Sequence, residues 1–159
     1  MDKKTLVLLF TIVLVCLIIG IITIFSKENK TNDKITDLDS FYFNYSSGYA
    51  MYAYTTFEVE KKGTYYQVSI KPNGIPDEKK YTKIEDQDFV DKLLKIINDY
   101  DVISWDGFIK NDKYVLDGNS FTLRLKGDKN ISATGYMMWP DNYYDVKDEL
   151  NNLFMEYYE

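Results

Sequence analysis

Two hydrophobic patterns divide the chain into a short apolar segment and a longer region of alternating character. Residues 5–25 form a stretch of 21 residues without a charge, which as a helix would be roughly 30 Å long, enough to cross the apolar core of a bilayer. The polar residues after it predict a tether without regular structure. We therefore predict a transmembrane anchor over residues 1–26, a tether over residues 27–38 and one folded domain over residues 39–159.

Two features indicate that the anchor is retained, and a third indicates its orientation. The apolar region of a cleaved signal peptide usually spans about 7–15 residues and ends in small residues, whereas this one is longer and ends in Ile24-Phe25-Ser26-Lys27. Cys16 lacks the preceding leucine and small residue typical of a lipidated cysteine. The four residues before the apolar run form a short tail, which is typical of a segment that stays in the cytoplasm. We predict a single-pass cell-membrane protein with its domain outside the cytoplasm.

Within the domain, the period of the pattern changes from two to about 3.6 and back. Alternating apolar and polar residues predict strands at 41–46, 51–60, 65–71, 80–84, 121–126 and 131–137, with a short strand and turn at 102–108. Helical stripes are predicted over 86–100, with Asp86 as the N-cap, and from about residue 141. The order β-β-β-(β)-α-β-β-α predicts an α+β fold, with one antiparallel sheet of five or six strands and both helices on one face.

The residue types available for chemistry exclude most catalytic arrangements. The chain contains no histidine, its one cysteine lies in the predicted anchor, and no glycine-rich phosphate-binding motif is present. A pair of carboxylates could still hydrolyse a glycosidic bond, and the candidates beside turns are Asp106, Asp117 and Asp141. Because these positions are also typical of turns and helix caps, we predict a domain that is not an enzyme.

The net charge of the domain and the spacing of its acidic residues exclude some classes of ligand. The first 34 residues hold five lysines and three acidic residues, so the remainder of this chain of net charge −6 has a net charge of −8. An acidic domain repels phosphate backbones, which argues against nucleic acid and favours a basic protein partner or simple solubility. The acidic residues near the last helix lack the spacing of a calcium loop. We therefore expect no cofactor and no metal.

Tyrosines fall on the predicted solvent face of the sheet. The alternation assigns to this face Tyr42, Tyr52, Tyr54, Tyr65 and Tyr136. Tyrosine is enriched in protein interfaces, but it is also a favourable strand residue that forms cross-strand pairs. Trp105 and Trp139 are interpreted as core or edge residues, with stacking on a sugar as the alternative. The tyrosines are the candidate binding residues, and both explanations stay open.

The second half of the chain resembles a family of uncharacterised extracytoplasmic domains. The resemblance rests on WDGF at 105–108, VLDGNSF at 115–121, ATGY at 133–136 and WPDNY at 139–143, and covers residue 86 to the C-terminus. Members occur on membrane-anchored proteins and lipoproteins of Gram-positive bacteria and have no known activity. The resemblance implies an outward-facing bacterial domain and adds no site residue.

Three functions are compatible with these patterns. The first is a membrane-tethered domain that recognises a protein partner through its open sheet face, for instance as an immunity or inhibitor protein. The second is a cell-wall or glycan-binding module that uses exposed aromatic residues. The third is a carboxylate-dependent hydrolase. The anchor and the missing catalytic residue types favour the first.

Overall fold

The computed structural model describes residues 2, 15, 34–46 and 54–156, except for the side chain of Asp77. The chain forms two compact units, residues 1–34 and 35–159. In the first unit Val15 is helical; the rest of the predicted anchor lies outside the described residues. Within the described part of the chain, no helix combines the length and the hydrophobicity needed to span a membrane.

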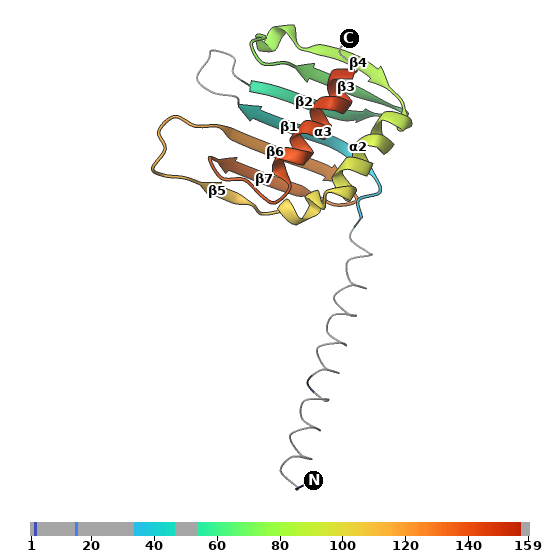
Figure 1. Ribbon diagram of the computed structural model, residues 1–159. Coiled ribbons are helices and arrows are strands. Elements are labelled where there is room, and N and C mark those ends of the chain that lie inside the picture. Colours follow the sequence, from blue (N-terminus) through green and yellow to red (C-terminus); the bar gives the residue numbers. More distant parts are fainter. Residues whose placement is uncertain (1, 3–14, 16–33, 47–53, 157–159) are drawn as a thin grey trace. The chain divides into compact units, whose positions relative to one another are not determined.

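The second unit is built on one mixed sheet of seven strands (Figure 1). The strands are β1 (Leu38–Ser46), β2 (Tyr54–Lys62), β3 (Tyr65–Lys71), β4 (Tyr81–Glu85), β5 (Ile109–Asn111), β6 (Ser120–Gly127) and β7 (Ile131–Tyr136). Their order is β4-β3-β2-β1-β6-β7-β5. Neighbours are antiparallel except β5 and β7, which are parallel. The pairing of β1 with β6 therefore joins the N-terminal strands β1 to β4 to the C-terminal strands β5 to β7.

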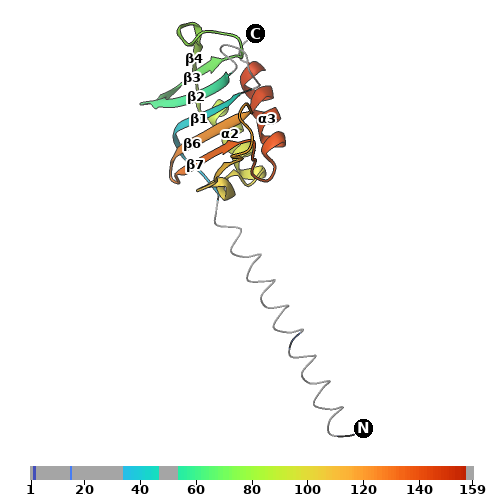
Figure 2. The ribbon, with the colours of Figure 1, turned by 90° about the vertical axis from the view of Figure 1, so that its left-hand side faces the viewer.

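Two α-helices lie on the same side of this sheet, as Figure 2 shows. Helix α2 (Gln87–Asp99) begins after Asp86, whose carboxylate accepts a hydrogen bond from the backbone N–H of Asp88 at 2.9 Å and so caps the helix. Helix α3 (Tyr143–Glu156) starts two residues later than the pattern predicted. The cause is Asn142, whose φ of 60° is left-handed and outside the helical region. A short 3₁₀-helix, η2 (Asp77–Lys79), precedes β4.

The predicted α+β class with one sheet and two helices is confirmed, but a wholly antiparallel sheet of five or six strands is wrong. Residues 102–108 do not form a strand; residues Val102–Trp105 form the 3₁₀-helix η3, and β5 follows it. Val102 and Trp105 are both buried. Residues three apart share one side of a 3₁₀-helix, which has three residues per turn, and would face opposite ways in a strand.

Aromatic rings fill the core between the sheet and the helices. Phe154 of α3 has no exposed surface. Its ring stacks on Phe57 of β2, with centroids 4.5 Å apart, and meets Phe89 of α2 edge-on at 5.2 Å. Trp105 is also buried, and its indole Nε1 donates a hydrogen bond to the Asp141 carbonyl at 3.0 Å. The helical layer and the sheet are thus joined by ring packing.

The folded domain begins before the predicted boundary at residue 39. Ile35 and Leu38 are both buried in the core. The Ile35 N–H donates to Asn98 Oδ1 at 2.8 Å, and Asn98 Nδ2 donates back to the Ile35 carbonyl at 2.9 Å. Residues 35–38, predicted as the end of the tether, therefore belong to the domain, because their apolar side chains complete its core.

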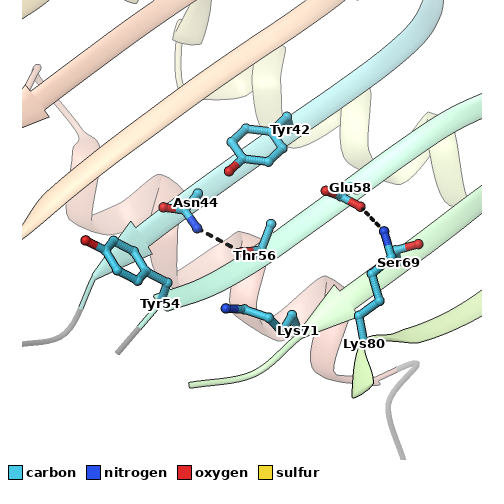
Figure 3. A pocket seen from close by; sticks show the side chains of 8 residues that line it. All are labelled: Tyr42, Asn44, Tyr54, Thr56, Glu58, Ser69, Lys71 and Lys80. Atoms are coloured by element: carbon cyan, nitrogen blue, oxygen red, sulfur yellow. Dashed lines mark hydrogen bonds and ion pairs between the residues drawn. The ribbon is translucent and has the colours of Figure 1, made fainter. Parts of the chain in front are cut away.

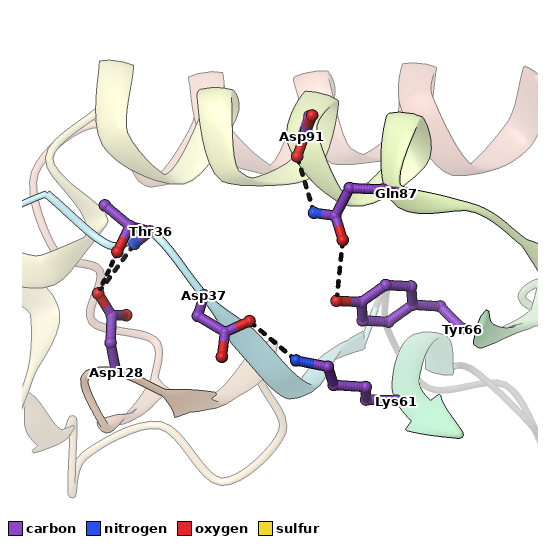
Figure 4. Close-up of polar contacts among 7 residues, drawn as sticks. All are labelled: Thr36, Asp37, Lys61, Tyr66, Gln87, Asp91 and Asp128. Atoms are coloured by element: carbon purple, nitrogen blue, oxygen red, sulfur yellow. Dashed lines mark hydrogen bonds and ion pairs between the residues drawn. The ribbon is translucent and has the colours of Figure 1, made fainter. Parts of the chain in front are cut away.

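Two carboxylates form contacts that hold the segment leading into β1 in place (Figure 4). Asp128 accepts hydrogen bonds from the backbone N–H and hydroxyl of Thr36, at 3.0 and 2.8 Å. Asp37 accepts one from Lys61 Nζ at 3.0 Å. Desolvation raises the pKa of Asp128, but the hydrogen bonds from Thr36 and from the backbone N–H groups of Asp37 and Lys129 together lower it overall. The hydrogen bond from Lys61 lowers the pKa of Asp37.

These lowered values predict a loss of stability in acid. A carboxyl group with a folded pKa below its unfolded value stabilises the domain above the unfolded value, near 4, and this contribution disappears as the pH falls through the folded pKa. We expect Asp128→Asn to be less stable than the wild type at pH 7, by up to about 1 kcal/mol, with the difference shrinking below pH 4. Denaturant unfolding between pH 7 and pH 2 measures it. Glu78→Gln, at an exposed carboxylate, is the control; a difference independent of pH would contradict this account.

Candidate functional site

The candidate site lies on the face of the sheet opposite α2 and α3, here called the open face. No helix among the described residues covers it (Figure 2). Residues that pair directly across the sheet share a face, so Tyr42 lies beside Glu58 of β2 and Arg124 of β6, and Asn44 lies beside Thr56 and Thr122. Alternation along the strands places the core phenylalanines on the other side. The open face is therefore polar and aromatic.

A hollow of about 470 Å³ lies on the open face (Figure 3). Its lining comes from β1, β2, β3 and the residue before β4: Tyr42, Asn44, Tyr54, Thr56, Glu58, Ser69, Lys71 and Lys80. The hollow presents hydroxyl, amide, carboxylate and ammonium groups together with two tyrosine rings. This combination suits hydrogen bonding to a polar ligand surface.

Contacts between the side chains fix the walls of the hollow. Asn44 Nδ2 donates to Thr56 Oγ1 at 2.8 Å, which orients the amide across β1 and β2. Lys80 Nζ donates to Glu58 Oε2 at 2.9 Å across β3. On the far side of Tyr42 from β2, the guanidinium of Arg124 lies over the tyrosine ring, 4.6 Å from its centroid. The walls are therefore held before any ligand arrives.

The structure places four of the five predicted tyrosines on this face and brings two of them together. Tyr42 and Tyr54 line the hollow. Tyr65 lies opposite Lys62 at the other end of β2 and β3, and Tyr136 lies opposite Ser120 on β7. Tyr54 and Tyr65 are 45% and 42% exposed, and Tyr42 and Tyr136 are half-buried. Tyr52 lies outside the described residues. Tyr42 and Tyr54 thus belong to one hollow, whereas Tyr65 and Tyr136 lie elsewhere on the open face.

Several residues of the site were missed by the sequence analysis. Glu58 and Arg124 stand at polar positions of alternating strands, but nothing local to either strand indicates that both flank Tyr42. The pairing of β1 with β6 and β2 supplies that information. Lys71 and Lys80 were missed in the same way. The available signal was the single arginine of the chain, which stands at a polar position of an alternating strand.

Of the three aspartates predicted as candidates for hydrolysis, Asp106 has a carboxylate with a clear structural role. Asp106 ends η3, and its Oδ1 accepts a hydrogen bond from the backbone N–H of Ser132 at 2.9 Å, which ties η3 to β7. Asp141 accepts the Trp105 indole N–H through its carbonyl. Asp117 lies in the connection between β5 and β6. None of the three lines the hollow of the open face, so the geometry gives no reason to assign them a reaction.

Other binding chemistry finds little support in the described residues. Among them, no group of three His, Cys, Asp or Glu side chains could hold a metal ion. Trp105 is buried, so its ring cannot stack on a sugar. Trp139 is half-buried, and its ring stacks on Tyr143 with centroids 4.5 Å apart. Both tryptophans are core or edge residues, as predicted.

No protein-family model matches the chain, and neither a curated protein nor a solved structure shows significant similarity to it.

Proposed function

We propose that this protein is a membrane-tethered, non-catalytic binding domain that recognises a protein partner outside the cytoplasm through the open face. The uncharged stretch over residues 5–25 supports the tether. An immunity or inhibitor protein, which blocks another protein at the membrane surface, is one form of this function. In this proposal no residue takes part in catalysis.

The open face is the observation that carries this proposal. A sheet packed on one side by helices usually exposes scattered charged and polar residues, whereas here Tyr42 and Tyr54 flank a hollow lined with hydroxyl and amide groups. Tyrosine offers a large, stiff contact area with few rotatable bonds, and it is enriched in protein interfaces. The Asn44–Thr56 and Lys80–Glu58 contacts hold the surface in one arrangement. Such preorganisation lowers the entropy lost on binding.

Site-specific photocrosslinking in the source cells tests the proposal. Tyr54 is replaced in the full-length protein by a photoreactive phenylalanine, which keeps the ring on the open face. Tyr144 of α3 is replaced in the same way as the matched control, because it is also an exposed aromatic residue, 57% accessible, but lies on a helix. We expect a protein adduct of defined mass from position 54 and none of that mass from position 144. Equal adducts at both positions, or none at position 54, would refute binding through the open face.

A further inference from the structure

The open face has the opposite charge to the rest of the molecule. Its paired strand residues and Lys80 include the basic side chains Lys62, Lys71, Lys80, Arg124 and Lys126. They include only two carboxylates, Glu58 and Glu60. The resulting net charge of +3 contrasts with −6 for the chain. Helices α2 and α3, on the other side, carry seven carboxylates and three lysines.

The two carboxylates of the open face are already engaged by lysines. Glu58 pairs with Lys80 at 2.9 Å, and Glu60 pairs with Lys62 at 2.6 Å. Each of these pairs is neutral, and Lys71 is buried, so the excess positive charge that is exposed on the face comes from Arg124 and Lys126. Arg124 and Lys126 are exposed and follow one another on the open side of β6. Positive charge is therefore concentrated next to Tyr42, near the middle of the sheet.

Arg124 is held in an orientation suited to an anionic group. It is the only arginine in a chain with 19 basic residues, and it belongs to β6, which pairs with the central strand β1. Its guanidinium lies over the ring of Tyr42, 4.6 Å from the centroid. A guanidinium on an aromatic ring keeps its in-plane N–H groups available, and their fork matches the two oxygens of a carboxylate.

From this juxtaposition we propose that the partner presents an acidic protein surface, with an Asp or Glu carboxylate bound by Arg124 beside Tyr42 and a second carboxylate near Lys126. The proposal rests on the function proposed above and specifies the chemistry of the partner. The net charge of −8 outside the first 34 residues had instead favoured a basic partner or simple solubility. The distribution of charge reverses that expectation for this face, because it is the contact surface that determines complementarity.

An acidic protein surface fits this face better than an extended polyanion or an anionic membrane. Charges are screened beyond about 8 Å at physiological ionic strength, so the basic residues act at contact range. A long polyanion would also pass the acidic remainder of the domain, which repels it. Tyr42, Tyr54, Asn44 and Thr56 add contacts suited to side chains and peptide groups. A protein surface with a compact cluster of carboxylates matches both the local positive charge and the polar and aromatic contacts of this face.

Peptide binding by the full-length protein in phosphatidylcholine nanodiscs tests the proposal. One probe is a set of short random peptides of Asp, Glu, Tyr, Ser and Gly, and the other is the same set with Lys and Arg in place of the acids. We expect the acidic set to be enriched. Arg124→Gln should weaken binding of a selected acidic peptide roughly tenfold. Arg124→Lys should bind the peptide with an affinity between those of Arg124→Gln and the wild type. Lys95→Gln, at an exposed lysine of α2, should leave the affinity unchanged.

Each alternative outcome has a definite meaning. Equal binding of both peptide sets, preference for the basic set, or no binding of either overturns the acidic partner. The same loss in Lys95→Gln as in Arg124→Gln also overturns it, because the effect would then be one of net charge. Binding to phosphatidylglycerol vesicles or to polyphosphate, but not to acidic peptides, would assign the face to a phosphate ligand. Crosslinking at Tyr54 to a protein segment without acidic residues would remove this proposal and leave the proposed function standing.

Discussion

Replacing Phe154 by alanine should lower the free energy of unfolding of the 35–159 unit by about 3–5 kcal/mol, the range found for large aromatic residues removed from a packed core. The Phe154 side chain is fully buried and stands between the sheet and α2. Its ring contacts Phe57 at 4.5 Å and Phe89 at 5.2 Å between centroids. The substitution removes apolar surface and leaves a cavity that the neighbouring rings of β2 and α2 cannot close. Denaturant unfolding followed by the fluorescence of the buried Trp105 measures the change.

Tyr144→Ala provides the comparison for this prediction. Tyr144 belongs to the same helix and also loses a six-membered ring, but it is largely exposed. Its replacement should cost about 1 kcal/mol or less. Similar losses for the two substitutions would mean that α3 is not held by the ring contacts of Phe154, and the packing described for the core would be wrong.

Phe154 also illustrates what the helical pattern could and could not indicate. The apolar stripe predicted for the last helix consists of Tyr143, Val146, Leu150, Leu153 and Tyr157. The first four are buried, and Tyr157 lies outside the described residues. The stripe omitted Phe154, which is also buried. A helix that packs on a sheet buries an apolar stripe wider than about 100°. Residues 153 and 154, which are adjacent in sequence, can both lie within such a stripe. The period predicts the direction of the face, whereas its width depends on the neighbouring elements.

The strands show the same division between local and distant information. Alternation correctly predicted the buried faces of β1, β3 and β6, because one side of each meets the core. Strand β5 has three residues, all exposed, so it has no alternation to detect. The order of the strands was not predicted from local patterns either. Tyr42 and Tyr54 could be placed on the open face from their own strands, but the contact of Arg124 with Tyr42 depends on the register between β1 and β6.

The N-terminal boundary of the domain was misplaced for a related reason, and its correction predicts a large effect. Ile35 and Leu38 stand among polar residues, which is typical of a tether, and only the tertiary structure shows that both are buried. A chain truncated to residues 39–159 should be less stable than one comprising residues 35–159 by about 4 kcal/mol or more, since each buried aliphatic side chain contributes about 2–5 kcal/mol. Free energies of unfolding in denaturant compare the two.

The hydrogen bonds of this segment add to the expected loss. Without residues 35–38, Asn98 loses both its bonds to Ile35, and Asp128 loses its bonds to Thr36. Polar groups left without partners in a partly buried position are costly.

The double substitution Ile35→Ala/Leu38→Ala in the 35–159 chain separates the two contributions, because it keeps the backbone bonds and removes the apolar contacts. If the 39–159 and 35–159 chains unfolded at the same denaturant concentration, residues 35–38 would belong to the tether after all. A loss of several kcal/mol would instead mean that the folded domain begins at residue 35, four residues earlier than its sequence pattern indicates. Such a loss would be a large part of a total stability of about 5–15 kcal/mol.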